Sequence, residues 1–326
     1  MKKFKLTLNH YLFIVICLLL VSYIASFKIK EKKYDKRELY KTELINEKYK
    51  DKITSFKITV NKKTLEIIKT GDFWQARLEN SNNFIPCNQG MVNEFIYDFT
   101  TLRSVYKFSD NYDPKNDTFG FFNNSDACHI QYFLDTDQSF EFYFGKQDFS
   151  FSSRYFMTPL RPIVYEMDES LDKYLSSSIQ VWGDPYMIFR TVLNNPQAKD
   201  IQQIYISSNE GSGNTVYDSD GSVSKFNIYK LLDSKTPDFE YIADKLLDLR
   251  HGGFPIQTIE QSNIEFKLKI IFGNKDSCEL SFYNSMDTDN DYNIIGEYTL
   301  SQLNKKYKFM SKISAWTYNK VKEMVL

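Results

Sequence analysis

Histidine is the side chain best suited to acid–base chemistry near neutral pH, and the chain has three. His10 lies in an apolar N-terminal run, His129 begins a predicted strand, and His251 follows a predicted helix. Cys128 precedes His129, but neighbours on a strand point to opposite faces, so we expect no nucleophile–base pair there. The motifs of zinc proteases, phosphate-binding loops, dinucleotide-binding folds and serine hydrolases do not occur. The sequence therefore predicts no enzyme activity and no catalytic residue.

Two acidic clusters carry carboxylates at alternate positions, as calcium loops of the EF-hand type do. In the cluster 287–291, Tyr292 and Tyr298 stand at the later positions where such a loop needs glycine and glutamate. The cluster 218–222 departs from the pattern at the same two positions. Solvated hairpin tips are the simpler interpretation of both clusters. The sequence predicts neither a metal site nor a cofactor.

Two arginines recur at the ends of predicted helices that match each other in the two halves of the chain, Arg103 and Arg250. An arginine fork can bind the carboxylate or phosphate of a partner, and it can also cap the last carbonyls of its own helix. His251 has the same two interpretations, because a cation stabilises a helix C-terminus. Arg103, Arg250 and His251 are therefore the candidate ligand- or partner-binding residues, and the capping role is the favoured one.

An apolar run of 22 residues, Leu6 to Phe27, contains no lysine, arginine, aspartate or glutamate. At about 1.5 Å per residue it is long enough to cross a bilayer as a helix. A cleaved signal peptide is the alternative, but the bulky Tyr23 stands where a small-x-small site ending at Ala25 needs a small residue. We expect an uncleaved single-pass anchor over residues 1–27. A charged linker over residues 28–50 then forms a solvated stalk or a flexible tether.

The side of the membrane on which the body lies stays open at this point. Basic residues flank the anchor on both sides, and their larger number after it favours a cytoplasmic body by the positive-inside rule. A short basic N-terminus before an apolar run instead resembles a signal anchor, which places the body outside. The two criteria disagree.

The rest of the chain has the composition of folded domains, with 42% hydrophobic and 25% charged residues over the whole sequence, and the net charge of −1 argues against a nucleic-acid partner. In each half, predicted strands precede a helix with an apolar stripe, over residues 89–103 and 238–250. Glu94–Asp98 matches Glu240–Asp244 at an offset of 146. The sequence predicts an α+β fold of two related antiparallel-sheet-plus-helix domains, 51–180 and 197–326, that arose by internal duplication. Chance similarity between amphipathic helices is the alternative.

A pattern of hydrophobic residues, turns and one tryptophan runs through residues 50–175. It consists of the hairpin Ile53–Val60 and Leu65–Ile68, then Gly71-Asp72-Phe73-Trp74, Leu102-Arg103, Phe119-Gly120-Phe121, Phe144-Gly145 and Tyr155–Tyr165. In this pattern the first half resembles the membrane-anchored bacterial family called domain of unknown function 4340. Cys87 and Phe121 depart from it, since the family more often has an acidic residue and leucine there. The resemblance implies an N-terminal anchor, an extracytoplasmic body and an association with ABC-type transport or gliding-motility components, and it implies no functional residues.

Three functions are compatible with these features. The first is a non-enzymatic accessory protein of the inner (cytoplasmic) membrane, with an extracytoplasmic body that binds an ABC-type permease complex or other envelope proteins. The second is a small-ligand module whose site is the cleft between the halves, with Arg103 or Arg250 facing into it. The third is an envelope hydrolase that uses His129, His251 and the acidic clusters. We expect the first.

Overall fold

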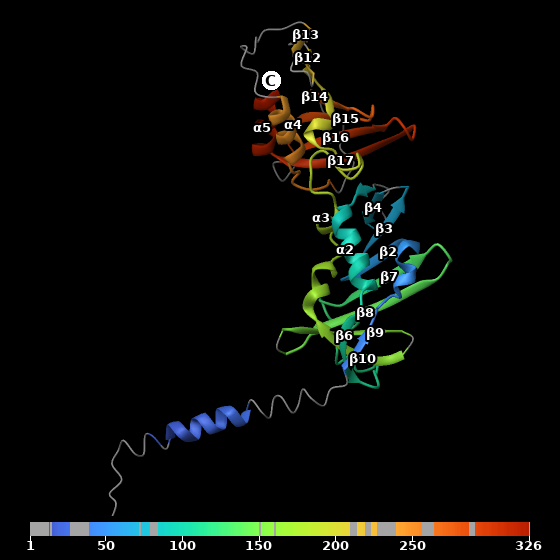
Figure 1. The fold of residues 1–326 in the computed structure, drawn as a ribbon, viewed down its shortest axis with the longest axis vertical. Coiled ribbons are helices and arrows are strands. Elements are labelled where there is room, and N and C mark those ends of the chain that lie inside the picture. The colour runs from blue at the N-terminus through green and yellow to red at the C-terminus, as the bar shows by residue number, and fades with distance from the viewer. Residues whose placement is uncertain are drawn as a thin grey trace, which may run out of the picture.

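The computed structural model describes residues 13, 15–26, 39–71, 73–78, 84–149, 151–159, 161–208, 214–218, 223–226, 239–255, 264–286 and 291–325 (Figure 1). The body consists of two antiparallel sheets and a few helices, so the predicted α+β class is confirmed. Most of the two acidic hairpin tips, residues 219–222 and 287–290, lies outside the described residues.

The helix near the N-terminus covers residues 15–26 of the described chain, and its apolar side chains are exposed. No helix in the described part of the chain is long and apolar enough to span a membrane. The predicted spanning helix, Leu6 to Phe27, stays a prediction, since only part of that run is described. Residues 6–12, 14 and 27 of that run lie outside the described residues.

The first sheet begins before the predicted domain boundary. The strand β1 (Leu39–Thr42) pairs antiparallel with β6 (Arg103–Ser109), and the short 3-10 helix η1 (Glu47–Lys52) follows it. Ile45 is fully buried, and its N–H donates to the carbonyl of Phe99 at 2.9 Å. The predicted linker over 28–50 is thus folded from residue 39 onward, because a few apolar side chains among its charges reach the core.

Ten strands form the first sheet, with the order β1-β6-β10-β9-β8-β7-β2-β3-β4-β5. The central strands β2, β3 and β7 alternate buried with partly exposed side chains, as expected where one face of a sheet is buried. The remaining strands are β2 (Ile53–Val60), β3 (Lys63–Thr70), β4 (Phe73–Leu78), β5 (Ile85–Pro86), β7 (Cys128–Leu134), β8 (Ser139–Gln147), β9 (Ser153–Thr158) and β10 (Arg161–Asp168), and the 3-10 helix η2 (Glu169–Tyr174) follows them.

The helix α2 (Gln89–Thr100) buries its apolar stripe on the first sheet, as predicted. The Phe95 ring packs on Phe56 of β2 and Tyr132 of β7, with ring centroids 4.8 and 5.3 Å apart. The side chain of Asn88 accepts a hydrogen bond from the N–H of Met91 and caps the first turn. The helix ends three residues before the predicted end, because Arg103 already begins β6.

Seven strands form the second sheet, with the order β13-β12-β11-β14-β15-β16-β17. The helices α4 (Phe239–Asp248) and α5 (Ala315–Val325) accompany it, and α5 begins later than the predicted start at Ser311 because the strand β17 continues to Ser314. The strands are β11 (Ile201–Ser208), β12 (Asn214–Asp218), β13 (Val223–Phe226), β14 (Ile264–Phe272), β15 (Ser277–Met286), β16 (Asp291–Leu300) and β17 (Lys305–Ser314).

The two sheets share one strand order. The sequence β4-β3-β2-β7-β8-β9-β10 in the first matches β13-β12-β11-β14-β15-β16-β17 in the second. Each half is thus a three-stranded meander, a helix and a four-stranded meander, joined by the first strands of the two meanders. The register agrees as well, since Ile130 pairs with Phe142 and Leu268 with Leu280, each 138 residues later. Strands β1, β5 and β6 are additions to this plan in the first half.

A packed segment joins the halves. The helix α3 (Ile179–Trp182) places Trp182 in the first core, and the residues after it place Phe189 in the second. The side chains of Phe73 and Ile85, from the first sheet, belong to the second core. The connection between the predicted domains is therefore part of both cores rather than an open tether.

Candidate functional site

Arg103 caps a helix. Its Nε donates to the carbonyl of Asp98 near the end of α2 at 2.9 Å, and its guanidinium lies 3.5 Å from the Asp98 carboxylate. A second nitrogen donates to the hydroxyl of Ser170 at 2.6 Å. These contacts leave only 13% of its side chain exposed, and they match the capping interpretation.

Arg250 and His251 lie at the junction of the halves. Arg250 is exposed, with its guanidinium 5.8 Å from the ring centre of Tyr186. Nε2 of His251 lies 2.6 Å from the carbonyl oxygen of Asp184, while its Nδ1 is buried and has no partner within the described residues. Burial lowers the pKa of His251, and the Asp184 carbonyl opposes that shift in part. Arg103 lies at the opposite end of α2, so the structure does not bring the three candidates into one site.

His129 lies on the face of the first sheet away from α2. Its ring stacks on Tyr143 with centroids 4.4 Å apart, and its Nε2 lies 3.6 Å from the carboxylate of Glu141. Burial lowers its pKa, although Glu141 acts in the other direction. The neighbouring Cys128 is buried in the core on the other face, as predicted, and burial raises its thiol pKa to about 12. In the described ranges no group of three or more His, Cys, Asp or Glu side chains could hold a metal ion.

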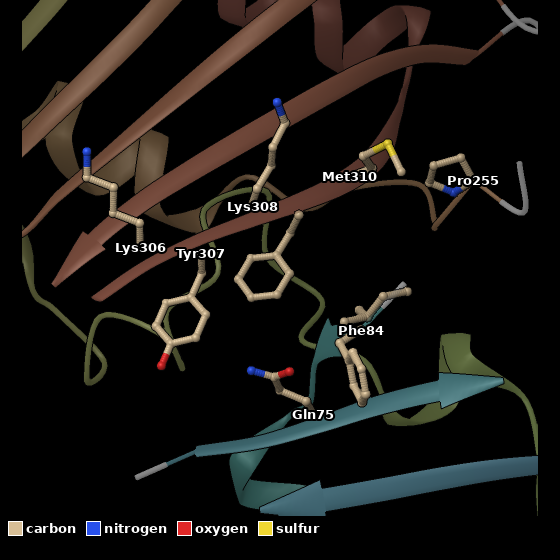
Figure 2. Close-up of a pocket in the computed structure, with 9 residues that line it drawn as sticks. Gln75, Phe84, Pro255, Lys306, Tyr307, Lys308 and Met310 are labelled. Carbon is tan, nitrogen blue, oxygen red and sulfur yellow. The ribbon is translucent and has the colours of Figure 1, made fainter. Parts of the chain in front are cut away.

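A groove of about 290 Å³ opens where the halves meet (Figure 2). One wall comes from the first sheet, with Gln75 of β4, Phe84 and Ile85. The other wall is the stretch Lys306–Met310 of β17, and Pro255 closes one end. Since β17 is the last strand of the second sheet, the groove runs along a sheet edge.

The backbone of β17 points alternately toward β16 and toward the groove. The N–H of Lys312 donates to the carbonyl of Gly253 at 2.8 Å, and its carbonyl accepts from Gly252, so residue 312 points away from β16. In an antiparallel ladder every second residue has the same orientation. The N–H and C=O groups of Lys306, Lys308 and Met310 therefore face the groove, where nothing in the described part of the chain pairs with them.

Side chains of two kinds flank this edge. Phe309 packs in the second core, and the ring of Tyr307 meets Phe73 of the first half with centroids 5.2 Å apart. Lys306 and Lys308 extend on the opposite side of the strand, away from Gln75 (Figure 2). Lys308 pairs with Glu297 at 3.1 Å, with both side chains more than half exposed, while Lys306 has no ion pair among the described residues. The rim of the groove is therefore basic.

A second cavity, of about 320 Å³, lies at the same junction beside the start of α2. Polar side chains dominate its lining, among them Asn88, Asn93, Asp184 and Arg190. Arg190 is already engaged, with hydrogen bonds to the carbonyl of Leu247 and the carboxylate of Asp248. Burial raises the pKa of Asp184. The backbone N–H groups of Tyr186 and Thr191, which donate to its carboxylate, oppose that shift. Neither Arg103, Arg250 nor His251 lines this cavity, the groove, or a third cavity of about 490 Å³ on the flank of α2.

The β17 edge was not among the residues that the sequence pattern singled out. The alternation of Lys306, Tyr307, Lys308 and Phe309 does predict a strand that is basic on one face and apolar on the other. One edge of that strand lacks a partner strand in the described sheet because β17 is last in the strand order. This order depends on strands far apart in the chain, and local periodicity does not encode it. Comparison of the chain with family models, with curated proteins and with solved structures finds no match.

Proposed function

We propose that this chain is a non-enzymatic accessory protein that binds an envelope protein through the groove between its halves. An N-terminal anchor tethers it to the inner membrane, and its body lies on the extracytoplasmic side. The observation that carries the proposal is that the outward N–H and C=O groups of Lys306, Lys308 and Met310 have no backbone partner among the described residues and face a groove walled by the other half. Soluble proteins seldom leave a sheet edge open without protection.

The lysines of β17 have a role in this proposal. Lysine on an edge strand suppresses indiscriminate pairing with other sheets. The wall formed by Phe84 and Ile85 restricts access further, because only a narrow element can enter between the two halves. An edge that is both open and restricted in this way suits a selective partner.

The partner that we propose is an ABC-type permease complex or a gliding-like complex of the envelope. This assignment rests on the resemblance of the first half to the family called domain of unknown function 4340. The common strand order of the two sheets supports a further part of the proposal, that the body arose by internal duplication and places two related domains side by side on one tether.

A small-ligand module is the second candidate function. The observation in its favour is the polar cavity of about 320 Å³ at the junction, which lies between elements of both halves. The version with Arg103 or Arg250 facing inward has no support, since neither residue lines the cavity. The two histidines of the hydrolase alternative lie in different halves, and no described contact joins them.

Site-specific photo-crosslinking in intact cells tests the proposal. A photoreactive amino acid replaces Met310 in the groove of the full-length protein, and the matched control replaces Trp316 of α5, which is 69% exposed and outside the groove. We expect position 310 to capture one or a few discrete envelope proteins, identified by mass spectrometry, that position 316 does not capture. The same products at both positions, or none from position 310, would contradict the proposal.

A further inference from the structure

At the end of the groove, two backbone hydrogen bonds already pair another segment with the outer edge of β17. Gly252 and Gly253 form two hydrogen bonds with Lys312, in antiparallel register with β17. Proline has no N–H to continue such a ladder, and Pro255 stands at the end of the groove. Beyond it, the outward groups of Lys306, Lys308 and Met310 have no partner within the described residues. In the described part of the chain, the edge thus accepts a strand at one end and remains open over the next three outward positions.

The two sides of the groove differ in chemistry. A chain added to β17 would alternate its side chains between the face of Lys306 and Lys308 and the face of Tyr307. On the Tyr307 side it would meet Phe84 and the amide of Gln75, which lie across the groove from Tyr307 (Figure 2), and also Ile85. On the lysine side it would meet two ammonium groups, of which Lys308 is shared with Glu297. Apolar and acidic residues in alternation would satisfy both sides.

The dimensions limit the occupant to a single strand. Strands β4 and β5 of the first half oppose β17 across the groove, and its volume of about 290 Å³ suits a few residues of extended chain. Pairing with the β17 edge of a second copy would bring a whole sheet against the first half of the chain. A short segment of another protein has no such conflict.

We propose that the groove takes an extended acidic segment of the partner protein, which pairs with the open edge of β17 as an added strand. The inference rests on the proposed function and names the chemistry of what is bound. Backbone hydrogen bonds to Lys306, Lys308 and Met310 supply affinity. The lysine side chains select alternate glutamates or aspartates, and the apolar wall selects the residues between them.

The test uses the full-length protein in detergent and a fluorescent hexapeptide that alternates glutamate and valine, with binding measured by fluorescence anisotropy. The control peptide alternates lysine and valine. We expect the acidic peptide to bind and the basic one not to bind. The double variant Lys306→Glu/Lys308→Glu reverses that preference.

The backbone part of the inference has its own pair of variants. Met310→Pro removes a groove-facing N–H without removing a bond to β16, and Met310→Ala keeps that N–H. We expect the peptide to bind Met310→Pro at least about tenfold more weakly than Met310→Ala, a loss of about 1.4 kcal/mol. Two further peptides carry N-methyl groups at every second amide. We expect no binding when the methyl groups replace the N–H groups that point toward β17, and unchanged binding when they replace those that point away from it. Circular dichroism of both variants confirms that they are folded.

Each other outcome overturns the inference. An added strand is excluded if the acidic peptide does not bind at about 1 mM. It is also excluded if the two Met310 variants bind the peptide equally, or if the two N-methylated peptides bind equally. A dimer that Met310→Pro dissociates would identify the occupant as a second copy. If crosslinks from position 310 persist while the acidic peptide fails, the proposed function stands and only the strand chemistry falls. If the crosslinks are absent, the proposed function itself falls.

Discussion

His251 joins the second half of the chain to the segment between the halves through one hydrogen bond. Its Nε2 lies 2.6 Å from the carbonyl oxygen of Asp184, and its ring packs against Phe254 with centroids 4.4 Å apart. Burial of the ring penalises the charged imidazolium and lowers the pKa of His251, while the backbone groups of Asp184 and Gly253 oppose that shift in part.

We predict that the unfolding free energy decreases as the pH falls from about 7.5 to about 5.5, through the usual histidine pKa near 6.5. In that window the unfolded chain takes up protons that the folded chain resists, because burial lowers the pKa of His251 and of His129 in the fold. Each histidine contributes a slope of at most about 1.4 kcal/mol per pH unit. Urea unfolding at several pH values measures it.

His251→Gln keeps a side-chain donor and cannot titrate, so it should reduce this pH dependence, and His129→Gln should reduce it further. Asp184 acts in the opposite direction at lower pH, because burial raises the pKa of its carboxyl, and the comparison therefore stays above about pH 5.5. An unchanged slope in both variants would show that neither imidazole is held neutral by the fold.

At the scale of elements, Arg154 ties three pieces of the first half together. Arg154 lies on β9, and two nitrogens of its guanidinium donate hydrogen bonds to the carboxylate of Asp172 in η2, at 2.7 and 3.0 Å. A third bond, at 2.6 Å, runs to the carbonyl of Gly145 in β8. Only 10% of the Arg154 side chain is exposed, so solvent replaces these bonds poorly. This arginine therefore helps to hold η2 against β8 and β9.

We predict that Arg154→Ala lowers the unfolding free energy by about 2–4 kcal/mol, because it removes the cation beside a largely buried carboxylate, which keeps only the amide of Gln147 as a donor, and one donor to the carbonyl of Gly145. The matched control is Arg77→Ala. The Arg77 guanidinium lies 2.5 Å from the Glu66 carboxylate, and the Arg77 side chain is 38% exposed. Exposed ion pairs contribute at most about 1 kcal/mol to the free energy of unfolding. Urea denaturation followed by circular dichroism compares the two. Equal losses would mean that Arg154 is no more than a surface ion pair.

The sequence predicts elements well where the period is local. The stripe Val92, Phe95 and Phe99 predicts α2, and the alternation from Phe56 to Val60 predicts β2. It does not predict β1, where Leu39 and Tyr40 stand among charges and are ordered by pairing with β6. The open edge of β17 is hidden for the same reason, since it follows from which strand ends the sheet. Arg103 was ambiguous because capping and ligand binding need the same guanidinium.

At the scale of the whole molecule, the halves behave as one body only if the segment between them is stiff. Asp184, which is 2% exposed, holds that segment: its carboxylate accepts the N–H groups of Tyr186 and Thr191, and its own N–H donates to Pro86 of the first half. Its carbonyl accepts from His251 of the second half. One residue therefore connects both halves. The groove along β17 depends on this connection, because its walls come from different halves.

We predict that both halves become labile at the same urea concentration. Two buried thiols report the unfolding of each half separately, since Cys128 lies in the first core and Cys278 in the second. Burial raises the pKa of each thiol to about 12, so each reacts slowly while its half is folded. Pulsed labelling with a maleimide, read by mass spectrometry, gives a midpoint for each.

Asp184→Ala should separate the two midpoints, because it removes the buried acceptor of two partly buried N–H groups and loosens the segment without touching either thiol. Asp168→Ala, at an exposed carboxylate that caps η2, should leave them coincident. Different midpoints in the unaltered protein would show that the halves fold independently. The groove would then open and close as the halves move, and an added strand would have to bind one of several arrangements instead of a fixed edge.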